Sequence, residues 1–214
     1  MNKFFMARGI IFFYCLLLFP VQVSSQTEKN PSHKSTEYKM LTLEKALEGI
    51  KIPASIKKQI SLIEVDFWGY DGKKHRGQLL VNSELKDEIR NIFKELYQVK
   101  FPIEKIIPVC VYSWSDDLSM NDNNTSCFNY RKVKNSEHLS MHAYGRALDI
   151  NPKNNPFIHN NRKEPVNGSY SPKSTGTITA NSKVVKIFKK YGWKWGGDWI
   201  HSKDYQHFYK NKTI

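Results

Sequence analysis

Strand-like and helix-like spacing of hydrophobic residues alternate along this chain, which predicts a mixed fold. Residues 60–68 alternate well enough for a strand, residues 70–73 form a turn, and residues 77–81 look like the returning strand of a hairpin. A helix over 84–99, capped by Asn82 or Ser83, follows from five apolar residues on one helical face. These five residues are Leu85, Ile89, Ile92, Phe93 and Leu96.

Three more segments have regular patterns. Residues 41–50 predict a short helix that Thr42 caps and Pro53 ends. Residues 106–113 read as a buried strand, because they are rich in β-branched residues. Residues 181–191 have helical apolar spacing and are followed by a glycine.

Two segments between these elements predict long loops. Residues 115–129 are full of Asp, Asn and Ser, and residues 152–178 contain four prolines and two glycines. Loops of this length are uncommon inside a compact domain and are often functional. We therefore expect both to form walls of a substrate groove.

The N-terminal residues read as an export signal. Lys3 and Arg8 precede an apolar stretch, residues 9–19, and small residues near position 25 suggest cleavage there. The alternative is an uncleaved anchor, but the stretch is short for a bilayer span. We expect a signal peptide at 1–25, a flexible leader at 26–39 and one domain at 40–214, in an exported protein of the periplasm, cell envelope or medium without stable membrane insertion.

Removal of residues 1–25 leaves 189 residues (214 − 25), which is enough for one domain. The full chain carries +13, so the mature form carries +11 (13 − 2), and it would be attracted to polyanions. The lysines are scattered rather than gathered in a stripe, which favours a solvated basic surface over nucleic-acid binding. Cys110 and Cys127 could form a disulfide in an oxidising compartment, or they could stay as two separate buried thiols. The sequence leaves both possibilities open.

Two short segments contain the residues for metal chemistry. Residues 140–149 include His142 and Asp149, and residues 204–208 include Asp204 and His207. Two imidazoles and one carboxylate form the ligand set of catalytic zinc, which keeps one position open. We therefore predict one zinc ion on His142, Asp149 and His207, in an α+β fold whose small antiparallel sheet carries the site between flanking helices.

Four further residues are candidates for the chemistry. Asp204 has no ligand role in this scheme, so it could serve as a general base, or it could orient a ligand. Arg131 could steady an oxyanion, or it could form a surface ion pair. Ser140 could bind substrate or fix the turn at Tyr144-Gly145, and Tyr144 could face the substrate groove.

The pattern S-x-H-x-x-G-x-A-x-D, followed by W-G-G-D-W and D-x-x-H-F, resembles the VanY-type D-alanyl-D-alanine carboxypeptidases and the related L-alanyl-D-glutamate peptidases. The similar region spans about residues 124–209. The resemblance implies zinc on His142, Asp149 and His207, Asp204 as the base, and an arginine for which Arg131 is the candidate. Asp204 replaces a glutamate of the better-studied carboxypeptidases, which leaves carboxypeptidase and endopeptidase specificity both open.

The expected function is therefore hydrolysis of an amide bond in peptidoglycan stem peptides by a monomeric zinc peptidase. Its partner would be the stem peptide and not a nucleic acid. The alternative is a zinc-containing module that binds wall peptides or an anionic partner without turnover.

Overall fold

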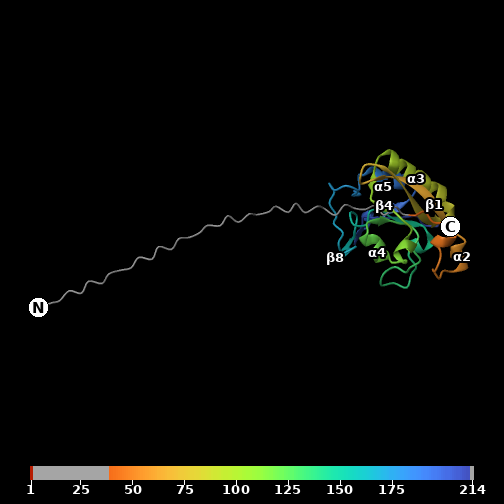
Figure 1. The fold of residues 1–214 in the computed structure, drawn as a ribbon, viewed down its shortest axis with the longest axis horizontal. Helices are drawn as coiled ribbons and strands as arrows, with labels where there is room; N and C mark the ends of the chain where they lie inside the picture. Colours follow the sequence, from red (N-terminus) through yellow and green to blue (C-terminus); the bar gives the residue numbers. More distant parts are fainter. Residues whose placement is uncertain (2–38, 213–214) are drawn as a thin grey trace. The chain divides into compact units, whose positions relative to one another are not determined.

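The computed structural model of this chain describes Met1 and residues 39–212. The predicted signal peptide and nearly all of the predicted leader lie outside the described residues. Residues 39–212 form an α+β fold of short helices and several small sheets, which confirms the expected class (Figure 1). No helix in this part of the chain is long and apolar enough to cross a membrane.

The helices within residues 39–212 are short, except for α3. The α-helices are α1 (Leu43–Ala46), α2 (Ala54–Lys57), α3 (Lys86–Gln98), α4 (Asp116–Asn121) and α5 (Lys183–Lys190). The 3-10 helices are η1 (Ser83–Leu85), η2 (Val109–Tyr112), η3 (Met141–Tyr144) and η4 (Gly196–Asp198).

The strands form four small sheets. One sheet has the order β2-β1-β3, with β1 (Ile60–Gly69), β2 (Lys74–Asn82) and β3 (Pro102–Ile103). A second has the order β6-β11-β9, with β6 (Ala147–Asp149), β11 (His207–Tyr209) and β9 (Lys194–Trp195). A third has the order β10-β7-β8, with β10 (Lys203–Asp204), β7 (Phe157–His159) and β8 (Arg162–Glu164). The fourth pairs β4 (Lys105–Ile106) with β5 (Asn124–Thr125).

The predicted hairpin and the long helix are confirmed, and together they form the main core. β1 and β2 pair in antiparallel register from Ile60–Asn82 to Trp68–Lys74. α3 lies along β1 (Figure 1) and buries its apolar face against alternate β1 residues, among them Val65 and Phe67. Leu148, Phe208 and the apolar face of α5 join the same core, so the sheet of β6 and β11 is packed against the hairpin layer.

The opposite face of the hairpin is buried only at the end formed by the start of β1 and the end of β2. Ile60 and Leu80 pack with Phe128 and with the short helix α1 in a second cluster. Thr42 caps α1 as predicted, since its hydroxyl accepts a hydrogen bond from the Lys45 amide at 3.3 Å. Pro53 does not simply end this segment, because it stands at the N-terminus of the further helix α2.

The strand predicted over 106–113 is wrong for most of its length. β4 ends at Ile106, and residues 109–112 form the 3-10 helix η2. Pro108 has no amide hydrogen for a ladder bond, and its φ of −58° suits the entry to a helix. The helical turn buries Val109 but leaves Val111 exposed, which a buried strand would not.

The prediction of a loop over residues 115–129 is also wrong. Ser115 caps α4 by accepting a hydrogen bond from the Leu118 amide at 3.2 Å, and residues 124–125 form β5. Asn124 is fully buried because its side-chain amide bonds both the amide and the carbonyl of Ile107, at 2.9 and 2.8 Å. The polar side chain of Asn124 therefore satisfies backbone hydrogen bonds in the interior and is not a sign of exposure.

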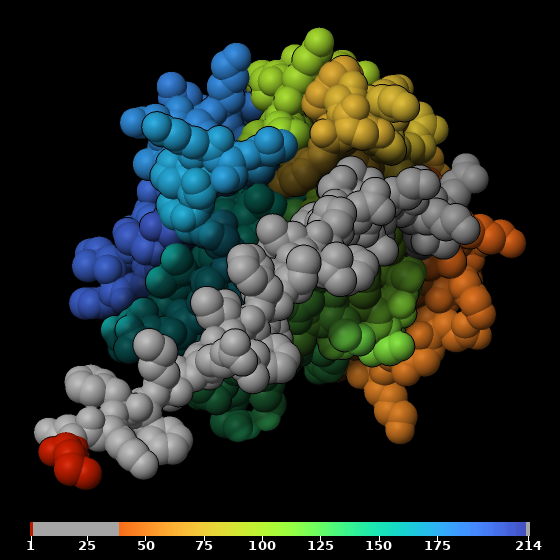
Figure 2. All heavy atoms as spheres, turned by 60° about the vertical axis from the view of Figure 1, so that its left-hand side comes forward, coloured from red at the N-terminus to blue at the C-terminus, as the bar shows by residue number. Residues whose placement is uncertain are grey.

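The predicted loop 152–178 contains the hairpin of β7 and β8, which pairs with β10. Its light-blue part stands at the surface in Figure 2, while its base is fixed by the buried Asn155. The Asn155 amide group donates to three backbone carbonyls, of Ile150, Asn151 and Gly176, at 2.9–3.1 Å. Its Oδ1 accepts from the Ile178 amide at 2.7 Å.

Replacement of Asn155 by alanine should lower the free energy of unfolding by about 3 kcal/mol, because several buried backbone groups lose their partners. Asn167 lies in the same loop, is exposed, and serves as the control. Denaturant unfolding measures both variants. Equal stability of Asn155→Ala and Asn167→Ala would contradict this role of Asn155.

Candidate metal centre

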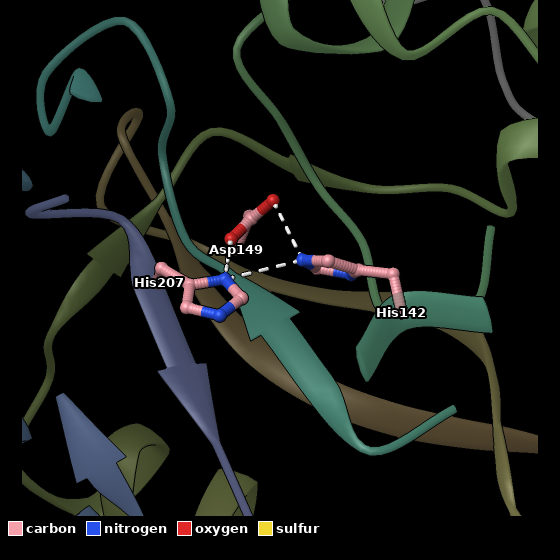
Figure 3. Close-up of side chains that lie close together, drawn as sticks. All are labelled: His142, Asp149 and His207. Atoms are coloured by element: carbon pink, nitrogen blue, oxygen red, sulfur yellow. Dashed lines mark hydrogen bonds and ion pairs between the residues drawn. The ribbon is translucent and has the colours of Figure 1, made fainter. Parts of the chain in front are cut away.

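Three side chains from separate elements converge in the interior: His142 of η3, Asp149 of β6 and His207 of β11 (Figure 3). His142 Nε2 lies 3.1 Å from Asp149 Oδ2, and His207 Nδ1 lies 3.0 Å from Asp149 Oδ1. The two ring nitrogens are 3.2 Å apart. His142 and Asp149 are buried, at 2% and 5% exposure, and His207 is half-buried.

Short-range capping places His142. The Ser140 hydroxyl accepts a hydrogen bond from the His142 amide at 3.3 Å and begins η3. Gly145 ends η3 with a φ of +63°, as the predicted turn requires. A side chain at Gly145 would meet the Asn82 backbone amide at 2.5 Å, so this turn packs directly against the end of β2.

Strand pairing places the other two residues. Asp149 and His207 are direct partners in the antiparallel pair of β6 and β11. On its other side, Asp149 exchanges two backbone hydrogen bonds with Ser126, at 3.0 and 2.9 Å. Asp149 is therefore held between two neighbouring segments, and its side chain shares a sheet face with His207.

The hydrogen bonds of His142 suit a metal ligand. Its Nδ1 lies 2.6 Å from the Cys127 carbonyl oxygen, which can only accept, so Nδ1 is the donor and the lone pair of the neutral ring is on Nε2. That lone pair, His207 Nδ1 and the Asp149 carboxylate converge within 4.8 Å. Converging buried acceptors repel one another unless a cation lies between them, so these residues fit a metal ion.

The charge state of Asp149 agrees with this assignment. Burial acts to raise the pKa of Asp149, but the charges and hydrogen bonds of His142 and His207 outweigh it and hold the pKa well below its usual range. Asp149 is therefore ionised at neutral pH, as a metal ligand must be.

Asp204 lies beside this group with an unused carboxylate oxygen. Its Oδ1 is buried and has no hydrogen-bond partner in the part of the chain that the structure describes. Burial raises the pKa of Asp204 to about 7, and the Asp149 charge adds to this, although His207, Gln206 and Arg131 act in the opposite direction. A carboxyl group with such a pKa can both accept and release a proton near neutral pH.

Gly196 packs closely against Asp204 and His207. A side chain at Gly196 would lie 2.6 Å from the Asp204 carbonyl oxygen, 2.7 Å from Asp204 Cβ and 3.3 Å from His207 Cβ. The absence of a side chain at Gly196 therefore lets η4 approach the backbone that carries the predicted base and the predicted ligand.

Arg131 is held at the edge of the site. Its Nη2 lies 2.9 Å from Asp116 Oδ2, and its Nε is buried without a hydrogen-bond partner among the described residues. Its positive charge is near enough to lower the pKa of Asp204. Arg131 therefore forms the ion pair that was expected as its alternative role, and it also lies near Asp204, the predicted base.

The other predicted residues are placed as follows. Ser140 is buried and bonds the His142 amide, which matches the turn role. Tyr144 is 37% exposed, and its backbone carbonyl accepts a hydrogen bond from the Asn82 side-chain amide at 3.0 Å. His138, His159 and His201 are exposed, as expected.

The tryptophans and cysteines are placed as follows. Trp193 and Trp195 are buried in the core. Trp199 is half-buried, with its ring centroid 5.7 Å from that of His207. Cys110 and Cys127 are both free thiols.

Four residues around this centre were not predicted from the sequence: Asp116, Asn129, Gln206 and Arg146. Arg146 is buried and binds Glu84 at 2.9 Å and the Lys210 carbonyl at 3.2 Å, which ties η3 to the segment after β11. Its place inside the motif was the available signal, because a buried arginine needs such partners.

A buried His–Asp–His group beside a protonatable carboxylate defines a metal-dependent hydrolase type of site. An M15 peptidase family model, described as D-alanyl-D-alanine carboxypeptidase, matches residues 134–210. The match confirms the resemblance for this segment, which contains His142, Asp149, Asp204 and His207, and it supports a metallopeptidase. Arg131 lies outside the matched residues. Comparisons with curated proteins and with solved structures give no match.

Zinc should bind to the three converging side chains and stabilise the fold. Free zinc at 100 times its dissociation constant should raise the free energy of unfolding by about 3 kcal/mol. His207→Ala should abolish this gain, whereas His138→Ala, at an exposed histidine, should keep it. Thermal unfolding with a zinc titration and a chelator measures both, and equal zinc stabilisation in the two variants would rule out this centre.

Proposed function

We propose that this protein is an exported zinc peptidase that hydrolyses an amide bond in the stem peptides of peptidoglycan. The observation that carries the proposal is the unpartnered, buried Oδ1 of Asp204 next to His142, Asp149 and His207. A carboxylate adjacent to three metal ligands is an arrangement suited to metal-dependent peptide hydrolysis, which needs both an activated water and a proton acceptor. The family match over residues 134–210 supports the peptide substrate.

His142 Nε2, His207 Nδ1 and one Asp149 oxygen would hold the zinc ion. When bound, zinc polarises a carbonyl group and lowers the pKa of a water molecule towards about 7. Cys127 fixes the His142 tautomer through its carbonyl group, and the pairing with Ser126 keeps Asp149 in place.

Asp204 moves the protons in this proposal. Its free Oδ1 accepts the proton of the attacking water and later gives it to the leaving amine. The pKa of about 7 suits both steps, because neither protonation state is strongly favoured at neutral pH. Arg131 supplies positive charge for the oxygen anion that develops on the attacked carbonyl.

The positive charge of the chain fits a polyanionic envelope as its surroundings. The bond cleaved is that of a D-Ala-D-Ala carboxypeptidase or of an L-Ala-D-Glu endopeptidase. Free D-alanine and larger stem fragments distinguish the two by mass when purified peptidoglycan is digested. Release should stop on chelation and return with added zinc.

Asp204→Asn should lower kcat by about 10²–10⁴-fold and leave zinc binding intact, because the amide cannot take up the proton. Asp198→Asn is the matched control, since Asp198 lies in the same segment and is exposed. The assay is fragment release from peptidoglycan, with zinc affinity measured by chelator competition. Full activity in Asp204→Asn would refute the base role, and no release by the zinc-loaded wild type would favour a binding module.

A further inference from the structure

The Arg131 side chain is held from α4, which lies in the segment 115–129 that was expected from the sequence to be a loop. Asp116, the first residue of α4, pairs through Oδ2 with Arg131 Nη2 at 2.9 Å. Its other oxygen, Oδ1, accepts a hydrogen bond from the Asn129 side-chain amide at 3.2 Å. Both oxygens of one carboxylate are thus engaged toward the segment that leads to His142.

Asn129 links this pair to the metal ligands. It is buried, at 3% exposure, and its backbone amide donates to the His142 carbonyl at 3.1 Å. The backbone of Arg131 is fixed as well, because its carbonyl accepts from the Ser140 amide at 3.0 Å. Asp116, Asn129 and Arg131 therefore form one connected unit with η3.

The position of Asp116 is itself set by local backbone geometry. Ser113 and Trp114 have positive φ values of 53° and 62°, which are uncommon for residues other than glycine. The Trp114 ring packs edge-on against Phe128 in the second core cluster, at a centroid distance of 5.9 Å. This turn leads into Ser115, which caps α4. The packing of Trp114 in the second cluster therefore determines where α4 begins and, with it, the position of Asp116.

An arginine side chain has many rotamers, so an ion pair on one edge restricts where its other edge can point. Here Asp116 holds Nη2, while Nε is buried and has no partner among the described residues. The side chains of Asp116 and Arg131 are 26% and 30% exposed, so the pair is only partly screened by solvent. Nη1 makes only a long contact of 3.5 Å with the Lys132 carbonyl oxygen, so Asp116 is the closer partner and sets the direction of the guanidinium group.

We propose that Asp116 is a positioning residue that aims the guanidinium group of Arg131 at the reacting carbonyl group. The inference rests on the proposed function, because it assigns Asp116 a part in the same hydrolysis. This role requires no contact of Asp116 with substrate or metal: its effect on the rate passes through Arg131, and its bond to Asn129 fixes the unit that carries Arg131.

The experiment compares the zinc-loaded wild type with Asp116→Ala, Asp116→Asn, Arg131→Ala and the double variant in peptidoglycan cleavage. Asp117→Ala is the matched control, because Asp117 is the next residue of the same helix and is exposed. Asp116→Ala should lower kcat by about tenfold with little change in KM, and the double variant should be no slower than Arg131→Ala. Asp116→Asn, which keeps an acceptor for Arg131, should recover part of the loss.

Zinc affinity by chelator competition and thermal unfolding are measured on every variant and should match the wild type. If Asp116→Ala unfolds, the Asp116→Asn variant and its double with Arg131→Ala decide the question. Activity of Asp116→Ala equal to that of Asp117→Ala, or additive losses in the double variant, would overturn the inference. A wild type without any cleavage would instead refute the proposed function.

Discussion

The metal centre depends on the backbone of Asp149, which lies between two neighbouring segments and gives both of its hydrogen bonds to one of them. Ser126 pairs with it on one side, and His207 lies opposite it on the other. This pairing brings together residues that are 58 positions apart in the chain, and it aligns their side chains on one sheet face. The carbonyl of Cys127, next to Ser126, then orients His142, so one short sheet edge arranges all three side chains.

Buried asparagines play the corresponding part outside the centre. Asn124, Asn151 and Asn155 are fully buried, and their amide groups satisfy the backbone of segments that have little regular secondary structure. A side-chain amide can replace missing ladder hydrogen bonds, because it has two donors and an acceptor. The irregular chain around the site is therefore as firmly connected as the hairpin core.

The sequence predicts the hairpin, α3 and α5 well, because their apolar spacing is regular and local. It fails where polar residues are buried: Ser115 and Asn124 looked like loop residues, yet one caps α4 and the other closes a hydrogen-bond network. His142, Asp149 and His207 could be selected by residue type and motif. Asp116 and Gly196 could not, because their roles come from contacts with distant residues, Arg131 in one case and Asp204 in the other.

The most direct test of the proposed centre is a crystal structure of the zinc-loaded protein with anomalous diffraction recorded at the zinc edge. The account predicts one strong peak at about 2.0–2.2 Å from His142 Nε2, His207 Nδ1 and an Asp149 oxygen. A peak elsewhere, or no peak between these three side chains in a protein that has bound zinc in solution, would contradict it.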